Sequence, residues 1–485
     1  MRRLGDGYGD RVSLELDLET AGVAEVGAAM ASGATTGVGL VEAYLDRIAT
    51  LNPLVNAIRC LAPDALERAA ALDAERAEGR VRGPLHGVPV LVKDNIDVAG
   101  LPTTAGSLAL EHSVPDRDAD VVVRLREAGA VVLGKTNLTE MANCMAEDMP
   151  SGYSALGGQV LNPYDLRFDA SGSSSGSGAA AALGLATVTV GTETDGSILS
   201  PASNQSLVGV KPTLGLVPGR GILPIASSQD CAGPMCRTVA DAAALLGVLA
   251  GETYGEGSGP EILRGVRLAL PPEPDELHGE EVEVFHAALD VLRERGAVLV
   301  EVPALPETDE LPVLIHEFAR DLDAYLADLP ESAPVRSMRE LVAWNAAHAD
   351  RALKFGQVLL DQALAVDHDA EHAAYVVRRA RDLAVAGEYG IDATLAIAGA
   401  AAIVFPGPHG CGVAARAGYP SLVVPAGYRR EGRRPVGLTF VGPSRTEGLL
   451  LSLGAAYEAA AQVRRPPSEI NPSLFQGAAG SPATG

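Results

Sequence analysis

The chain has 485 residues, of which 62 are Asp or Glu and 38 are Lys or Arg, so its formal net charge is −24. A chain this acidic has no general field that would hold nucleic acid or an anionic membrane surface, and we expect neither as a partner. Hydrophobic residues make up 47% and charged residues 21%, as in a globular protein with a large core. Arginine supplies nearly all of the basic residues, because the only lysines are Lys93, Lys135, Lys211 and Lys354.

The sequence predicts neither a targeting signal nor a metal site. The N-terminal segment is polar and rich in Gly and lacks an apolar signal region, and apolar stretches elsewhere are broken before they reach the width of a bilayer. We therefore expect a cytoplasmic protein in which residues 1–15 form a loose tail. The five cysteines are scattered and odd in number, which fits neither a disulfide framework nor a zinc site. We expect no metal and no cofactor.

The first half of the chain changes from a helical pattern to alternating strands and helices. Apolar residues recur at helical spacing over 17–77, and Asn52-Pro53 predicts the end of one helix. Short β-branched runs and helical stretches then alternate at 89–92, 120–128, 130–133, 178–186 and 188–190. This alternation indicates an α/β protein with a large mixed, mostly parallel central sheet that helices cover on both faces.

The second half begins with a region of different composition. Residues 255–390 combine acidic clusters, proline-rich loops and long amphipathic stretches, so we expect a mostly helical elaboration there. Further elements are expected as strands at 266–270, 297–302, 394–405, 422–425 and 437–441 and as a helix at 447–461. We predict a single domain over 16–466 that contains this helical insertion, followed by a flexible C-terminal tail over 467–485.

The segment Ser171–Gly178, with the sequence Ser-Gly-Ser-Ser-Ser-Gly-Ser-Gly, allows three interpretations. A flexible linker is the usual meaning of this composition, but a linker would not run directly into an Ala-rich helix and a β-branched strand. A phosphate-binding loop would end in Gly-Lys-Ser/Thr, which is missing. We favour a catalytic loop, in which glycines let backbone amides approach a reacting carbonyl and serines supply hydroxyl groups.

A catalytic serine needs a base, because the pKa of its own hydroxyl is far above neutral. His86 and His409 lie beside glycines, but neither has an acidic residue that would orient it. Lysine can serve as the base where burial lowers its pKa, and Lys93 follows the apolar run Val90-Leu91-Val92. Lys135 also follows a strand-like run, so spacing alone leaves it as a rival.

Several motifs together resemble the amidase signature family. They are the stretches 85–95, 171–178, 191–201, 209–213, 228–238, 418–420 and 435–438. The resemblance covers about 20–250 and 390–465, and the motifs around the serines are most similar to those of bacterial peptide amidases. It implies the amidase signature fold and the hydrolysis of a carboxamide.

The resemblance also assigns roles to individual residues. It implies a Ser-Ser-Lys triad in which Ser197 is the nucleophile, Ser173 is the bridging serine and Lys93 is the base. It implies a cis peptide bond between Gly172 and Ser173, and it places Lys135 in a structural role.

The same resemblance implies an oxyanion hole formed by the backbone amides of Thr194, Asp195, Gly196 and Ser197. The sequence departs from many family members at Leu199, where they carry arginine.

The function expected from these residues is an amidohydrolase that releases ammonia or an amine and a carboxylate, from a small amide or from a C-terminal peptide amide. We expect a monomer or a homodimer. The alternative is the glutaminase subunit of a tRNA-dependent amidotransferase complex, which uses the same triad but needs partner subunits. A binding protein with an inactive amidase fold is a third possibility, disfavoured by the complete triad.

Overall fold

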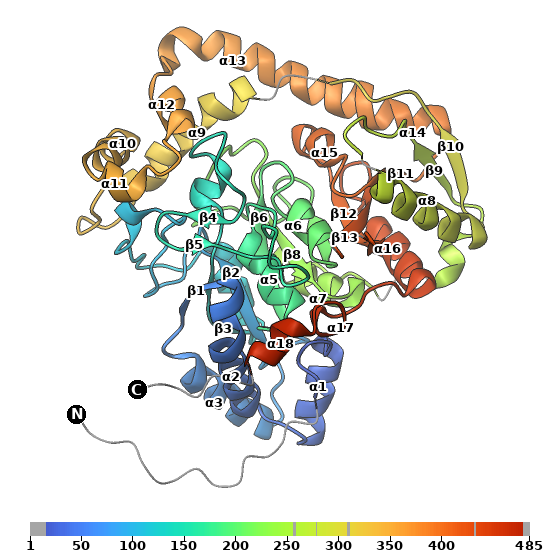
Figure 1. Ribbon diagram of the computed structural model, residues 1–485, viewed down its shortest axis with the longest axis horizontal. Coiled ribbons are helices and arrows are strands. Elements are labelled where there is room, and N and C mark those ends of the chain that lie inside the picture. Colours follow the sequence, from blue (N-terminus) through green and yellow to red (C-terminus); the bar gives the residue numbers. More distant parts are fainter. Residues whose placement is uncertain (1–15, 256–258, 278, 308–310, 431–432, 479–485) are drawn as a thin grey trace.

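An 11-stranded mixed sheet runs through the protein (Figure 1). The computed structural model describes residues 16–255, 259–277, 279–307, 311–430 and 433–478, so the expected tail over 1–15 lies outside the described residues. The strands, in the order in which they lie in the sheet, are β1 (Ile58–Leu61), β3 (Val131–Thr136), β2 (Pro89–Lys93), β6 (Val188–Glu193), β8 (Cys231–Cys236), β7 (Val208–Lys211), β12 (Ser421–Tyr428), β13 (Pro435–Val441), β11 (Ala402–Pro406), β9 (Arg267–Leu270) and β10 (Val298–Glu301). A separate hairpin joins β4 (Tyr153–Ser154) to β5 (Gly158–Gln159).

Parallel pairing is confined to two blocks of the sheet. β3, β2 and β6 form one block, and β11, β9 and β10 form the other. The remaining six of the ten neighbouring pairs are antiparallel. The expected mixed central sheet is therefore confirmed, with more antiparallel pairs than the alternation of helices and strands suggested.

Helices cover both faces of this sheet, as β12 shows. Leu422 and Val424 lie in the main core cluster together with Leu453 of α16 (Glu447–Ala461). Val423, between them, lies in a different cluster with Leu199 of α6 (Leu199–Asn204). Alternate residues of a strand point to opposite faces, so α16 and α6 lie on opposite sides of the sheet.

The helices of the first half are α1 (Val23–Ser32), α2 (Gly37–Val55), α3 (Ala65–Ala77), α4 (Asp120–Glu127), α5 (Ser175–Ala182) and α7 (Val239–Ala250). The expected end at Asn52-Pro53 is two residues too early, because Pro53 lies inside the last turn of α2, which ends at Val55. Asn56 caps the C-terminus of the helix: it has a φ of 57° and donates its backbone N–H to the carbonyl of Asn52. None of the described helices is both long enough and apolar enough to cross a membrane.

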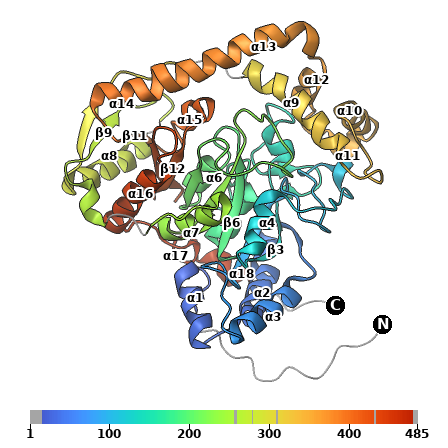
Figure 2. The same cartoon turned by 180° about the vertical axis from the view of Figure 1, so that it is seen from behind.

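The region 255–390 contributes mainly helices, as expected. They are α8 (Gly279–Glu294), α9 (Leu311–Ala327), α10 (Met338–Ala347), α11 (Ala349–Ala352), α12 (Val358–Leu364) and α13 (His368–Leu383). In both views α13 runs along the top of the molecule, from α12 on one side to α14 (Ala393–Ala398) on the other (Figures 1 and 2). A π-helical segment, Ala384–Asp392, joins α13 to α14.

Two expectations for the C-terminal part are corrected. The run 394–405 begins as helix α14, which ends at Gly399 with a φ of 56°, and only β11 is a strand. The expected flexible tail begins with α17 (Pro467–Ile470) and α18 (Ser473–Ala478), after α15 (Cys411–Ala417) and α16. Ile470 and Leu474 are buried, so apolar packing holds this segment despite its Pro and Gly content. Residues 479–485 lie outside the described part.

The Gly/Ser segment is packed rather than flexible. All eight residues of α5 are buried. A Cβ atom on Gly176 would lie 2.3 Å from the carbonyl oxygen of Ala57 and 2.4 Å from that of Asn137, and one on Gly178 would lie 2.2 Å from the Nε2 of Gln205. The glycines are therefore required for close approach of neighbouring chain segments, which contradicts the linker interpretation.

We predict that Gly176→Ala lowers the free energy of unfolding by about 1–3 kcal/mol, because backbone carbonyls cannot move away from the new methyl group without strain. Urea denaturation measures this change. Gly27→Ala in α1 is the matched control, since its Cβ would meet nothing within 4 Å, and it should stabilise the protein by up to about 1 kcal/mol. Equal stabilities of the Gly176 variant and the wild type would contradict the packing argument.

Candidate active site

Lys93 ends the buried strand β2, and its side chain reaches two neighbouring segments. Its Nζ lies 2.8 Å from the Oγ of Ser173, 2.9 Å from the Oγ1 of Thr192 and 3.2 Å from the carbonyl oxygen of Thr192. β2 lies between β3 and β6, so Lys93 is fully enclosed. All three of these partners are uncharged oxygen atoms.

Burial without a carboxylate contact lowers the pKa of Lys93 to about 7. Three groups act in the opposite direction by favouring the charged form: Asp230, Glu193 and Cys144. Desolvation of the amino group outweighs their combined effect. The amino group can therefore be neutral near neutral pH, as a base must be.

Lys135, the rival base, lies in a different environment although it is equally buried. Its Nζ is 3.2 Å from the Oδ1 of Asp94, and both side chains are fully enclosed. Thr103 Oγ1 and the carbonyl oxygen of Pro102 complete its contacts, at 3.1 and 3.2 Å. Lys135 therefore compensates a buried carboxylate, and no hydrogen bond joins it to Ser173 within the described part of the chain.

The other two lysines lie away from this cluster. Lys211 is buried and donates to the carbonyl of Pro212 at 3.1 Å. Lys354 lies in a turn after α11, with its Nζ 5.0 Å from the centre of the Tyr153 ring. His86 is a core residue, since Nε2 contacts the carbonyl of Leu72 at 3.0 Å.

Ser173 and Ser197 are brought together by contacts between their neighbours. The peptide bond Gly172–Ser173 is cis, as the family resemblance implied. The backbone N–H of Ser174 donates to the carbonyl of Ser197 at 3.2 Å, which joins the start of α5 to the loop after β6. The Oγ of Ser174 also donates to the carbonyl of Thr192 at 3.0 Å. Lys93, Ser173 and Ser197 thus belong to one packed cluster.

The loop after β6 is shaped by a buried carboxylate. Glu193 accepts hydrogen bonds from the N–H groups of Ile198 and Leu199, at 2.7 and 2.9 Å, and so turns the chain back at the start of α6. Gly196 has a φ of 75°, in the left-handed region that favours glycine. Ser197 is only 7% exposed, and its Oγ makes no hydrogen bond to any described residue.

Four consecutive backbone amides in this loop have no acceptor within the described part of the chain: those of Thr194, Asp195, Gly196 and Ser197. Buried N–H groups are normally hydrogen-bonded, so amides left without a partner beside a serine can bind an oxygen atom of a ligand.

A cavity of about 280 Å³ is lined by Thr192, which contacts Lys93, whereas Lys93, Ser173 and Ser197 are not among its lining residues. Its polar lining includes Asn95, Thr192, Thr194 and Asp230. Its apolar lining consists of residues such as Leu214, Val217, Ile222, Leu223 and Ile225. A second cavity of about 600 Å³ is lined by Asp195 together with Cys411 and other residues of α15.

Three polar residues of the site were missed in the sequence analysis. Thr192 contacts Lys93, and the Nδ2 of Asn95 donates to the Oγ1 of Thr192 at 3.0 Å. Asp230 accepts a hydrogen bond from the Oγ1 of Thr194 at 2.5 Å. Thr192 and Asp230 lie within recognised motifs, but their partners became evident only once the pairing of β2, β6 and β8 was known.

Comparisons with known proteins agree with this architecture. Residues 39–382 match the family described as Amidase. A probable amidase of Arabidopsis thaliana is 37% identical over 491 residues, which covers 95% of this chain and 94% of that protein. A glutamyl-tRNA(Gln) amidotransferase component of Chloroflexus aurantiacus is 35% identical, over 89% of this chain and 94% of its own length. The crystal structure of native peptide amidase from Stenotrophomonas maltophilia superposes with a TM-score of 0.86 at 44% identity, covering 92% of this chain and 98% of that one.

The fold, the family match and these relatives define an enzyme that hydrolyses amide bonds. The chain belongs to the amidase signature family, as its sequence motifs predicted.

We predict that Lys135→Met lowers the free energy of unfolding by about 3–5 kcal/mol, because it leaves the buried carboxylate of Asp94 without its cation. Lys354→Met provides the control and should change stability by less than about 1 kcal/mol. Denaturant unfolding of both variants measures the difference, and a Lys135 variant as stable as the wild type would refute the structural role.

Proposed function

We propose that Lys93, Ser173 and Ser197 act as a Ser-Ser-Lys triad that hydrolyses a carboxamide through an acyl-enzyme. The observation that carries this proposal is the 2.8 Å hydrogen bond between the Nζ of Lys93 and the Oγ of Ser173. The lowered pKa of Lys93 supports its role as the base, and the amides without acceptors at 194–197 support an oxyanion hole beside Ser197.

In the proposed reaction the Oγ of Ser197 attacks the amide carbonyl carbon and passes its proton to Ser173, whose own proton moves to neutral Lys93. The carbonyl oxygen becomes negative and accepts hydrogen bonds from the four backbone amides. The proton then returns through Ser173 to the leaving nitrogen as the C–N bond breaks. Water, deprotonated along the same path, hydrolyses the ester on Ser197 and releases the carboxylate.

The proposed substrate is a C-terminal peptide amide or another small amide, from which the reaction releases ammonia or an amine. The support is the 44% identity to a peptide amidase, together with the apolar lining of the 280 Å³ cavity, which suits an uncharged acyl group. The cytoplasmic location and the monomeric or homodimeric state remain predictions from the sequence.

The second candidate is the glutaminase component of a tRNA-dependent amidotransferase, favoured by the 35% identity to a component of such an enzyme. The two candidates differ in a simple property. If the first is correct, the purified chain alone releases ammonia from amidated dipeptides. If the second is correct, the chain is inactive alone and needs partner subunits.

We expect Ser197→Ala to reduce ammonia release from amidated dipeptides at least about a thousandfold, because no other group would form the acyl-enzyme. Circular dichroism and thermal unfolding establish that the fold is retained. Ser200→Ala is the matched control, since this serine lies three residues further along in α6, and it should keep most of the activity. A fully active Ser197 variant would refute the proposed triad.

The pH dependence of kcat/KM tests the proposed base. Only neutral Lys93 can accept a proton, so kcat/KM should rise with pH and reach half of its plateau near pH 7, where burial places the pKa of this group. Initial rates between about pH 5 and pH 9 measure the profile. A rate that falls as the pH increases through neutrality would show that the protonated form is the active one.

A further inference from the structure

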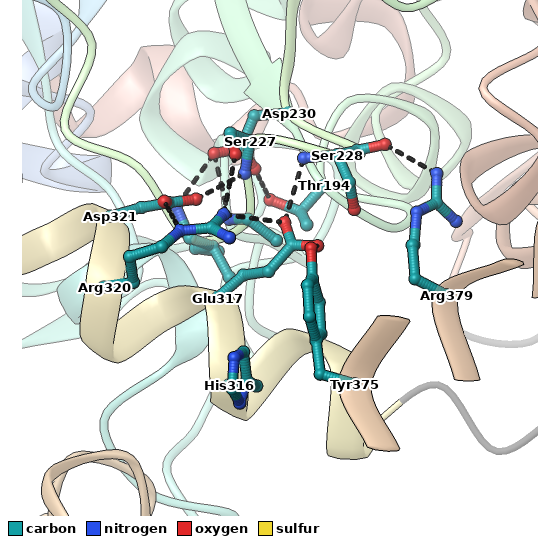
Figure 3. A network of polar contacts seen from close by, with 12 residues as sticks. Thr194, Ser227, Ser228, Asp230, His316, Glu317, Arg320, Asp321, Tyr375 and Arg379 are labelled. Atoms are coloured by element: carbon teal, nitrogen blue, oxygen red, sulfur yellow. Dashed lines mark hydrogen bonds and ion pairs between the residues drawn. The ribbon is translucent and has the colours of Figure 1, made fainter. Parts of the chain in front are cut away.

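The helical insertion makes polar contacts with the loop that precedes β8. Figure 3 shows Glu317, Arg320 and Asp321 of α9 pointing toward Ser227 and Ser228, with side chains of α13 beside them. Four of these side chains contact the loop, and a fifth, that of Tyr375, donates to Glu317. We call the five the anchoring cluster: Glu317, Arg320, Asp321, Tyr375 and Arg379.

Glu317 is the centre of the anchoring cluster. Its side chain is fully buried. One carboxylate oxygen accepts the N–H of Ser228 at 2.9 Å, and the other accepts the hydroxyl of Tyr375 at 2.8 Å. Arg320 lies 3.7 Å away as its cation. A buried carboxylate is costly unless it is paired and hydrogen-bonded, and here both oxygens are used by other segments of the chain.

Asp321 supports the same loop from the next position along α9. Its Oδ2 accepts the N–H of Ser227 at 2.8 Å, and its Oδ1 accepts from the Nε of Arg320 at 2.7 Å. Arg320 also donates to the hydroxyl of Ser227 at 3.0 Å. Residues four apart lie on the same face of a helix, so Glu317 and Asp321 present two carboxylates to two consecutive backbone amides.

Arg379 of α13 joins this loop to another segment near the active site. It donates to the carbonyl of Ser228 at 2.9 Å and to the carbonyl of Arg416, in α15, at 2.8 Å. Helix α15 begins at Cys411, which lies close to Gly196. A Cβ atom added to Gly196 would be 3.2 Å from the Sγ of Cys411. The insertion therefore contacts segments that flank the loop carrying Ser197.

The anchored loop carries Asp230, which connects it to the proposed oxyanion hole. The carboxylate of Asp230 accepts from the N–H groups of Ile225 and Ala226, at 2.9 and 3.1 Å, and from the hydroxyl of Thr194 at 2.5 Å. Thr194 begins the segment whose amides lack acceptors among the described residues. Ile225, Ser227 and Asp230 also line the 280 Å³ cavity.

We propose that Glu317 is a positioning residue for amide hydrolysis, which fixes the 225–230 loop so that Asp230 holds Thr194 and the oxyanion segment in place. This inference rests on the proposed function of Ser197. It assigns the insertion an indirect part in the reaction: α9 and α13 set the geometry of the site through the anchoring cluster.

Glu317→Gln tests the proposal, because glutamine keeps the volume of the side chain but loses the charge that the two donors share. We expect kcat for an amidated dipeptide, normalised to the folded fraction, to fall about 10- to 100-fold. This is the size of effect expected when hydrogen bonds to a charged group are weakened. Asp323→Asn is the matched control. Asp323 lies on the same helix, but its carboxylate accepts the N–H of Met338 at 2.5 Å and does not contact the 225–230 loop. The kcat of the Asp323→Asn variant should therefore be unchanged.

The pH profile separates positioning from a merely structural role. The ionisable groups that act on Lys93 are Asp230, Glu193 and Cys144, and only Asp230 lies on the anchored loop. The ionised carboxylate of Asp230 raises the pKa of Lys93, and burial raises the pKa of Asp230 itself to about 7. Moving this carboxylate away should therefore lower the pKa of Lys93 at any pH at which Asp230 is ionised. The acid limb of kcat/KM should therefore shift to lower pH in Glu317→Gln, in the same direction as in Asp230→Asn.

If the Glu317→Gln variant is folded and has the kcat of the wild type and the same acid limb in its pH profile of kcat/KM, the proposal is overturned. If that variant does not fold, Tyr375→Phe removes a single donor to Glu317 and should still lower kcat by at least about threefold, and wild-type behaviour there would overturn it equally. Ser197→Ala distinguishes failure of the proposed triad from failure of the proposed role of Glu317. An active Ser197→Ala variant refutes the triad, whatever the activity of Glu317→Gln.

Discussion

The proposed active site depends on one buried lysine that has no carboxylate beside its amino group. Lys93 is enclosed at the end of β2 and donates to hydroxyl and carbonyl oxygens, so the protein stabilises its neutral form. Its neighbour Lys135, near the end of the adjacent parallel strand β3, is equally buried but paired with Asp94. The proposed base, Lys93, and the lysine that compensates a buried carboxylate, Lys135, thus differ mainly in this one partner. Arginine could not replace Lys93, because it does not lose its proton.

The cluster around Lys93 requires close packing of chain segments that are distant in sequence. Glycines at 176, 178 and 191 allow α5 and β6 to approach their neighbours, since a Cβ on any of them would lie within 3 Å of another atom. Glu193 turns the chain after β6, and Asp230 holds Thr194 from the loop before β8. The insertion then contacts that loop from outside (Figure 3).

Much of the fold could be predicted from the sequence, because apolar runs and consecutive motifs are local signals. The structure brings Lys93, Ser173 and Ser197 into one cluster, and their catalytic roles stay predictions. The strands β2 and β6 and the helix α16 lie where periodicity placed them. Features that depend on tertiary contacts were missed. Pro53 is tolerated within the last turn of α2, and Leu474 packs a segment with tail-like composition into the core. Spacing alone also left Lys135 as a rival base, since only the pairing with Asp94 distinguishes it.

The small number of lysines allows a direct measurement of the pH at which the amino group of Lys93 loses its proton. Four lysines give four side-chain signals in a protein labelled with ¹³C at lysine Cε, and the signal of Lys93 is identified by its absence in Lys93→Met. We predict that this signal titrates with a midpoint near pH 7, as burial lowers the pKa of Lys93 to about 7. A Lys93 signal that remains that of an ammonium group up to about pH 9 would show that this lysine cannot act as the base near neutral pH.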